Sequence, residues 1–184
     1  LDELKKLELI YESGYQPELA YMFKHALTHD VAYSTLLIER RRALHRTVAD
    51  GIETLFAERL TEHYEALAYH YEKSQTWDKA LDYLERAGDK AVSACANQEA
   101  IGFYTRALKA SEILGDEARS RRLGIAEKRA WIYCTVADYV AAVESEGIVL
   151  KVAEETDDTV LESHALTLIG FFQTYGHDFE PAEA

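Results

Sequence analysis

Apolar residues recur at helical spacing along most of the chain, with polar residues at the positions between them. From about Leu60 onward this periodicity is interrupted only by short breaks, and each break contains a residue that caps a helix or forms a turn well. The pattern predicts six helices, near residues 60–74, 77–95, 97–114, 117–135, 138–155 and 158–176. The chain has only 2 Pro and 9 Gly, so little in the composition interrupts long helices.

Residues 1–58 follow a different pattern. Two strand-like runs, LELIYES and LAYMFKH, flank a break at Gly14 and Pro17, which predicts a β-hairpin. A long helix from Val31 to Phe56 is predicted next, with Thr28 as its cap and Asp30 in its first turn. The apolar stripe expected along it comprises Val31, Leu36, Leu37, Leu44, Val48, Ile52 and Leu55. A helix, a hairpin and a further helix are typical of the tail of a winged-helix-type domain.

The stretch from Leu67 to Ala87 carries a more specific spacing. A large–small pair and an aromatic on one helix are followed by small, bulky and small residues on the next. These residues are Leu67, Ala68 and Tyr71, then Ala80, Leu84 and Ala87. The spacing is typical of a tetratricopeptide (TPR) repeat. Such units bury their apolar faces mainly against neighbouring units, so we expect a scaffold with a groove.

The repeat recurs in weaker form further along the chain. The recurring positions are Ala130, Tyr133, Tyr139 and Ala142, and then, in part, Gly170, Phe179 and Ala182. In the middle section the phase differs, because Ala80 and Ala100 lie 20 residues apart rather than the about 34 residues of a TPR unit. The repeat register of residues 88–122 therefore stays open. Small residues are expected where helices cross closely, namely Ala68, Ala80, Ala87, Ala100 and Ala107, with Tyr71, Trp77, Leu84 and Tyr104 filling the space between hairpins.

Charge narrows the range of partners. The formal net charge is −13, which argues against non-specific binding to nucleic acid, because that binding needs a basic face. The same charge argues against docking on an anionic membrane surface. A protein or peptide partner, basic or amphipathic, suits the chain better.

The cysteines and the chain ends add two expectations. Cys95 and Cys134 lie inside predicted helices without metal-type spacing, so they are expected to be free buried thiols in a reducing cytoplasm. No apolar run approaches the roughly 20 residues of a membrane span, and the expected localisation is cytoplasmic. The chain lacks a starting Met and ends where another helix would begin, so it is expected to be a fragment of a longer protein.

Three segments carry a resemblance to a known family. They are Phe23-Lys24-His25-Ala26-Leu27-Thr28, then Asp30-Val31-Ala32-Tyr33, then Arg40-Arg41-Arg42-x-Leu44-His45. Together they resemble the junction between the ATPase domain and the repeats in large bacterial signalling ATPases of the STAND type, which are AAA-related. Those proteins are often fused to a class III adenylate or guanylate cyclase domain. The stretch Leu81–Ala91 is similar to the start of their repeat region, and the resemblance covers most of residues 1–115.

The resemblance implies a place for this chain within such a protein. The cyclase and ATPase domains would precede it, a winged-helix element would occupy residues 1–58, and sensor repeats would occupy residues 59–184. The sequence has no G-x-x-x-x-G-K-[ST] motif, so no P-loop can be carried over. The cyclase's metal-binding carboxylates cannot be placed either. No catalytic residue, cofactor or metal is therefore predicted for the fragment itself.

Two candidate contact surfaces follow. TPR arrays line their concave wall with the first helix of each repeat, and in the best-matched repeat the outward positions are Glu62, Glu65, Tyr69, Glu72 and Lys73. This acidic surface would steer a basic or amphipathic peptide and anchor it on the tyrosine. The alternative is a merely solvated helix face. A basic cluster of Arg40, Arg41, Arg42 and Arg46 is expected to pair with Glu39, Asp50, Glu53 or the parent ATPase domain, with contact to nucleic acid as the alternative.

Several other groups favour packing over chemistry. His25, His29 and Asp30 could share a metal at helical spacing, but capping and packing are the better interpretation. His63 and His70 are expected to be partly packed imidazoles on a solvated face. Trp131 and Tyr133 could mark a ligand pocket, although aromatics at helical spacing are more often core.

These observations predict an all-α fold. It would be a TPR-like antiparallel helix-hairpin solenoid, a right-handed superhelix, with a small N-terminal winged-helix remnant containing a β-hairpin. The expected function is non-catalytic: a protein-interaction and regulatory segment of a larger signalling ATPase or nucleotide cyclase. Intramolecular contact with the parent ATPase domain is part of this expectation. The alternatives are a DNA-binding transcriptional regulator fragment and a self-assembly module, in which an exposed end of the array caps another copy of the chain.

Overall fold

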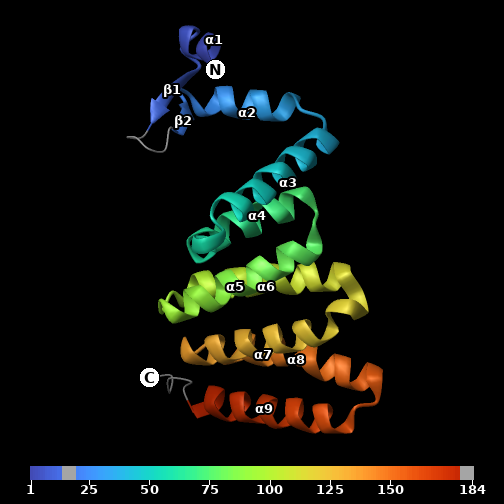
Figure 1. The fold of residues 1–184 in the computed structure, drawn as a ribbon. Helices are drawn as coiled ribbons and strands as arrows, with labels where there is room; N and C mark the ends of the chain where they lie inside the picture. The colour runs from blue at the N-terminus through green and yellow to red at the C-terminus, as the bar shows by residue number, and fades with distance from the viewer. Residues whose placement is uncertain (14–19, 179–184) are drawn as a thin grey trace. The chain divides into compact units, whose positions relative to one another are not determined.

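A computed structural model describes residues 1–13 and 20–178 of the 184-residue chain (Figure 1). The fold is mostly helical and contains a small β-hairpin, so the all-α prediction is confirmed at this level. The chain divides into two compact units, Leu1–Leu44 and His45–Ala184. The division falls inside helix α3, earlier in the chain than the predicted boundary after residue 58.

The first unit contains the predicted hairpin. Helix α1 covers Asp2–Lys6, and strands β1 (Ile10–Ser13) and β2 (Ala20–Phe23) pair antiparallel. The register places Ile10 opposite Phe23 and Tyr11 opposite Met22. The predicted break at Gly14 and Pro17 lies outside the described residues. The sequence therefore located the hairpin correctly, since both strands fall within the two runs of apolar and aromatic residues.

The predicted long helix from Val31 to Phe56 is wrong, because the structure has two helices there. Helix α2 covers Ala26–Thr35 and helix α3 covers Ile38–Leu55, with Leu36 extended between them. The hydroxyls of Ser34 and Thr35 donate hydrogen bonds to the carbonyls of Val31 and Ala32. Such bonds compete with the helix's own ladder and favour its end.

The predicted start of this region is also wrong. Helix α2 begins at Ala26 with an extended His25 at the N-cap, so Thr28 lies inside the helix and Asp30 lies beyond the first turn. In the second unit, α3 buries His45 and Ala49 and packs Ile52 against the core, whereas Val48 and Leu55 of the predicted stripe are exposed. The buried face of α3 is thus rotated from the predicted one.

The second unit continues as a series of helices close to the predicted positions. A 3₁₀ segment, η1 (Ala57–His63), leads into α4, and a second, η2 (Gly115–Ala118), leads into α7. The α-helices are α4 (Tyr64–Ser74), α5 (Trp77–Ser93), α6 (Asn97–Leu114), α7 (Arg119–Thr135), α8 (Tyr139–Thr156) and α9 (Thr159–Asp178). From α4 to α9, consecutive helices pack on one another, as Figure 1 shows.

A residue with positive φ ends nearly every helix of this unit. Four of these residues are not glycine, namely Gln75, Cys95, Ala137 and Asp157, and Gly115 completes the series. Their positions recur every 20 to 22 residues, so one helix and its turn form the spacing unit. Two such helices make a hairpin of about 40 residues, which is longer than a TPR unit. The 20-residue separation of Ala80 and Ala100 is therefore one helix step.

Small residues lie at the helix crossings, as the sequence predicted. Ala68, Ala80, Ala87, Ala100 and Ala107 are all fully buried. Tyr71, Leu84 and Tyr104 are also buried and fill the space between helices, while Trp77 is partly buried at the edge of the same core. Cys95 differs from the prediction, because it is exposed in the turn after α5 rather than buried in a helix.

Gly88 marks the closest approach of α5 and α6. A Cβ built on Gly88 would lie 2.4 Å from Cε1 of Tyr104. This ring is buried, and its hydroxyl donates a hydrogen bond to Asp89, so it cannot easily move away. A side chain at Gly102 of α6 would meet nothing within 4 Å. Both glycines lie inside helices, but only Gly88 lacks room for a side chain.

We expect Gly88→Ala to lower the free energy of unfolding by roughly 1–3 kcal/mol, because overpacking outweighs the gain in helix propensity. Gly102→Ala is the matched control and should raise stability by about 0.5–1 kcal/mol. Urea denaturation followed by circular dichroism measures both. Equal effects of the two substitutions would show that α5 and α6 do not approach closely at this glycine.

Candidate functional site

The predicted contact surface on α4 is partly open. Tyr69 is 45% exposed, and the Lys73 ammonium lies 5.6 Å from the centroid of its ring. Glu62 is exposed at the end of η1 and pairs with Arg59, whose Nε lies 3.0 Å from a carboxylate oxygen. These three predicted residues are available to a partner.

The other two predicted residues are turned toward neighbouring helices. Glu65 pairs with Lys90 of α5 at 2.8 Å, and Glu72 accepts a hydrogen bond of 3.0 Å from Nε of Arg106 on α6. Both carboxylates are only partly exposed. The helical spacing correctly put them on the same helix but could not reveal these basic partners, which come from helices later in the chain. Much of the expected acidic character is therefore neutralised within the protein.

A hollow of about 620 Å³ lies beside the C-terminal end of α5, the start of α6 and the C-terminal half of α7. Its apolar lining comes from Val92, Trp131 and Ile132, and its other lining residues are Asp89, Cys95, Asn97, Tyr104, Lys128 and Thr135. Trp131 is 48% exposed at the hollow and contacts the Phe172 ring edge-on at 5.5 Å between centroids. The sequence identified Trp131 as a candidate pocket residue. The rest of the lining could not be predicted, because it is brought together by the packing of three helices.

The polar end of the hollow is held by a fixed network. Lys128 Nζ lies 2.8 Å from Asp89 Oδ1 and 3.0 Å from Glu85 Oε1, and the Tyr104 hydroxyl donates to Asp89 at 2.6 Å. Burial and the Asp89 carboxylate raise the pKa of Tyr104, so its hydroxyl remains a donor at neutral pH. Burial alone would lower the pKa of Lys128, but hydrogen bonds to the two carboxylates raise it. The hollow thus combines an apolar wall with a stable, ordered polar edge.

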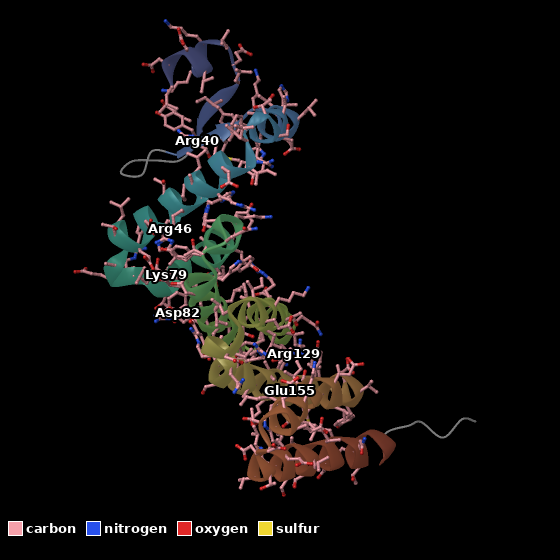
Figure 2. All side chains as sticks on the ribbon, turned by 90° about the vertical axis from the view of Figure 1, so that its right-hand side faces the viewer. Arg40, Arg46, Lys79, Asp82, Arg129 and Glu155 are labelled. Atoms are coloured by element: carbon pink, nitrogen blue, oxygen red, sulfur yellow. The ribbon has the colours of Figure 1, made fainter. Side chains whose placement is uncertain are left out.

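The arginine cluster is largely paired with nearby residues. Arg42 pairs with Glu39 at 3.0 Å, and Arg46 pairs with Asp50 at 2.9 Å. The Arg41 guanidinium lies over the Tyr33 ring, and Arg40 is exposed. Glu53 pairs instead with Lys79 at 2.7 Å and accepts from the Tyr83 hydroxyl. Figure 2 labels Arg40, Arg46 and Lys79 along this charged part of the chain.

Two histidines meet where α3 packs on α4. Nδ1 of His45 lies 2.9 Å from Nδ1 of His70, so at least one of the two rings is neutral when this bond forms. Burial, followed by the Lys73 charge, lowers the pKa of His45. Burial, followed by His45, lowers the pKa of His70. Tyr69 also contacts both rings edge-on. His63, which the sequence also predicted to be a partly packed imidazole, packs on the Phe56 ring.

The candidate metal group at the start of α2 does not form a compact cluster. His29 Nδ1 lies 3.0 Å from the Asp30 carboxylate, and its ring stacks with Tyr33. His25 serves as the N-cap residue of α2. Packing and local pairing therefore account for His29 and Asp30.

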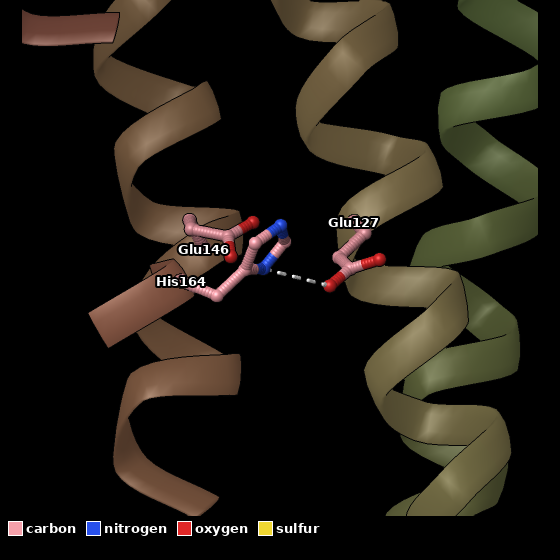
Figure 3. Close-up of side chains that lie close together, drawn as sticks. All are labelled: Glu127, Glu146 and His164. Atoms are coloured by element: carbon pink, nitrogen blue, oxygen red, sulfur yellow. Dashed lines mark ion pairs between the residues drawn. The ribbon is translucent and has the colours of Figure 1, made fainter. Parts of the chain in front are cut away.

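A different cluster of metal-type residues lies in the last three helices. Glu127 of α7, Glu146 of α8 and His164 of α9 each bring one donor atom within 4.8 Å of the others. Figure 3 shows the imidazole and the Glu146 carboxylate facing Glu127, whose oxygen lies 3.6 Å from His164 Nδ1. Burial, together with the Glu127 charge, raises the pKa of Glu146 to about 7. The sequence analysis missed this group because no short motif joins residues on three helices.

Comparisons with known proteins add no relative. No family model matches the chain, and neither the curated proteins nor the solved structures give a significant match. Across residues 1–13 and 20–178, none of the helices has both the length and the apolar character needed to cross a lipid bilayer.

The histidine pair predicts a specific dependence of stability on pH. Because both imidazoles have lowered pKa values, the folded chain binds fewer protons at this pair than the unfolded chain, whose histidines titrate near about 6.5. The pair's contribution is present above that pH and is lost as the pH falls through the lower, folded-state pKa values. We expect His70→Gln to weaken the fall in the free energy of unfolding between about pH 7.5 and pH 5.5.

Urea denaturation across this pH range measures the difference between the original chain and the variant. The many carboxylates contribute equally to the pH dependence of the two proteins. The difference between their free energies of unfolding therefore reports on the histidine pair. His29→Gln is the control, because His29 is exposed on α2, outside the His45–Ala184 unit. A difference for His70→Gln that does not change with pH would contradict the assignment.

Proposed function

We propose that this chain is a non-catalytic protein-interaction and regulatory segment of a larger signalling ATPase or nucleotide cyclase. Its helices would form a TPR-like scaffold in a reducing cytoplasm, and the hollow beside α5, α6 and α7 would bind a partner segment. The sequence resemblance supports the regulatory role. The binding surface is supported by a half-exposed tryptophan at the edge of a hollow with an ordered polar end.

The composition of the hollow favours an amphipathic helix as the partner. Val92, Trp131 and Ile132 offer apolar area, and tryptophan is among the residues that most often anchor an interface. Asp89 and Lys128 already pair with each other, so a partner would bury them without leaving an unpaired charge. The net charge of −13 would speed the approach of a basic partner through long-range attraction. A helix with an apolar face flanked by lysines would supply both the apolar contact and the positive charge.

The two tryptophans allow a direct test. Trp77 is partly buried against the core, whereas Trp131 lies at the hollow. In a Trp77→Phe background the remaining tryptophan emission comes from Trp131. We expect titration with amphipathic Leu/Lys helical peptides to shift this emission, and we expect Trp131→Ala to weaken binding roughly tenfold or more in calorimetry.

Two control variants locate the binding surface. Val160→Ala removes an apolar residue of α9 that is 80% exposed and lies away from the hollow, and it should leave affinity unchanged. Tyr69→Ala tests the α4 surface that the sequence predicted. Loss of affinity with Tyr69→Ala alone would move the binding surface to α4. Equal affinity in all variants would contradict a specific site on either surface.

Self-assembly is a second candidate, supported by the exposed apolar surface of the last hairpin. Val140, Leu166, Phe171 and Tyr175 of α8 and α9 are all substantially exposed. A smaller hollow of about 300 Å³ lies between these helices and is lined by Tyr139, Val140, Val143, Glu144, Phe172, Gln173 and Gly176. Light scattering over a concentration series tests this candidate, and Val140→Asp should reduce any association that this surface supports.

A further inference from the structure

We propose that Glu127, Glu146 and His164 form a binding site for a divalent transition-metal ion, with Zn²⁺ as the cation that this donor set suits best. The site would join α7, α8 and α9. It is separate from the hollow at Trp131, so the peptide-binding proposal and the metal proposal can fail independently.

The Glu146 side chain is buried without a partner among the residues that the structure describes. It is 0% exposed, and neither of its carboxylate oxygens has a hydrogen-bond partner there. Burying a carboxylate without a partner is costly, and proteins normally compensate for it with a counter-charge, a proton or a metal ion. Among the described histidine, cysteine and acidic side chains, those grouped with Glu146 are Glu127, which is also acidic, and His164. A cation between the three side chains would supply the missing positive charge.

Equivalent positions in other helices of the unit hold apolar or aromatic side chains where α8 has Glu146. Glu146 lies seven residues after the start of α8, and the same position is Leu84 in α5, Tyr104 in α6 and Ala126 in α7. All three are apolar or aromatic and at most 1% exposed. The turns after α5 and α8 match as well. After α5 the backbone N–H of Ala96 donates a hydrogen bond to the carbonyl of Ala91, and after α8 the N–H of Asp158 donates to the carbonyl of Ala153. The fold therefore fills this position with an apolar or aromatic side chain elsewhere, and packing does not explain a glutamate there.

The donor atoms lie close together and can be reached from solvent. All three lie within 4.8 Å of one another, and His164 Nδ1 lies 3.6 Å from the Glu127 carboxylate. Tetrahedral bonds of about 2.0–2.2 Å to a common ion hold the donors about 3.3–3.6 Å apart, so the donors must close by up to about 1.5 Å, and His164 is exposed enough to rotate. Glu127 and His164 are partly exposed and offer an entry path from solvent, whereas Glu146 lies at the buried end (Figure 3).

The donor types select among cations. Mg²⁺ and Ca²⁺ prefer oxygen ligands alone, whereas imidazole with carboxylates suits Zn²⁺ and neighbouring transition metals. Three protein ligands leave a fourth tetrahedral position for water. The inference concerns binding, and no reaction is assigned to this water.

Calorimetric titration of the untagged chain with Zn²⁺ tests the site, and the absorption spectrum of bound Co²⁺ reports its geometry. We expect one ion per chain, with affinity reduced at least roughly tenfold in Glu146→Gln and in His164→Gln. Glu155→Gln is the matched control, because Glu155 is an exposed residue on the same helix and pairs only weakly with Lys151. It should bind Zn²⁺ as the original chain does. Equal affinity in all four proteins would overturn the proposal by showing adventitious binding to surface carboxylates.

Thermal unfolding gives a second measurement that does not depend on titration heats. We expect saturating Zn²⁺ to raise the unfolding midpoint of the original chain by several degrees and to leave Glu146→Leu unchanged. That variant carries the residue found at the equivalent position of α5, so it should fold without metal. An equal shift in both proteins, or no shift in the original chain, would count against the site. Failure of Glu146→Leu to fold would contradict the argument from the helix repeat.

Discussion

Close contact between consecutive helices is the constraint on which the His45–Ala184 unit depends. From α4 to α9, consecutive helices bury their apolar faces on one another, so the core is a continuous series of helix–helix contacts along the unit. Such contact requires small residues at the crossings. Ala68, Ala80, Ala100 and Ala107 supply them, and Gly88 brings α5 against the Tyr104 ring. The larger side chains then fill the remaining space between crossings.

Ion pairs reinforce this packing between helices that are distant in sequence. Glu72 of α4 is held by Arg106 of α6, while Glu85 of α5 is held by Arg121 and Lys128 of α7. Each of these pairs joins helices two steps apart, which direct packing of consecutive helices does not connect. Partly exposed ion pairs contribute little singly, so their main effect is to fix the orientation of the helices. They also neutralise acidic groups that would otherwise face a partner.

The sequence revealed the helices well because their signals are local. The breaks between helices coincide with residues that turn or cap well, such as Gly115, Asp138 and Asp157, and the apolar spacing between the breaks is regular. Cys95 and Ala137 also take positive φ, but neither residue type signals a helix end. The hairpin strands were found for the same reason. The break at Leu36 was missed because the hydroxyls of Ser34 and Thr35 end the helix where the apolar spacing continues. The contacts of Glu65 and Glu72 were missed because their partners lie on other helices.

The Glu127, Glu146 and His164 group illustrates what local signals cannot show. In sequence these residues look like three unrelated polar positions on amphipathic helices, and Glu146 would be assigned to solvent. The structure buries Glu146 because the helix spacing places it where Leu84 lies in α5. A unit built from neighbouring pairs has few ways to link three helices at one point. A bound cation would do so at the end of the helix series where exposed apolar side chains on α8 and α9 leave the packing least complete. Metal occupancy would then couple the order of α8 and α9 to that of α7.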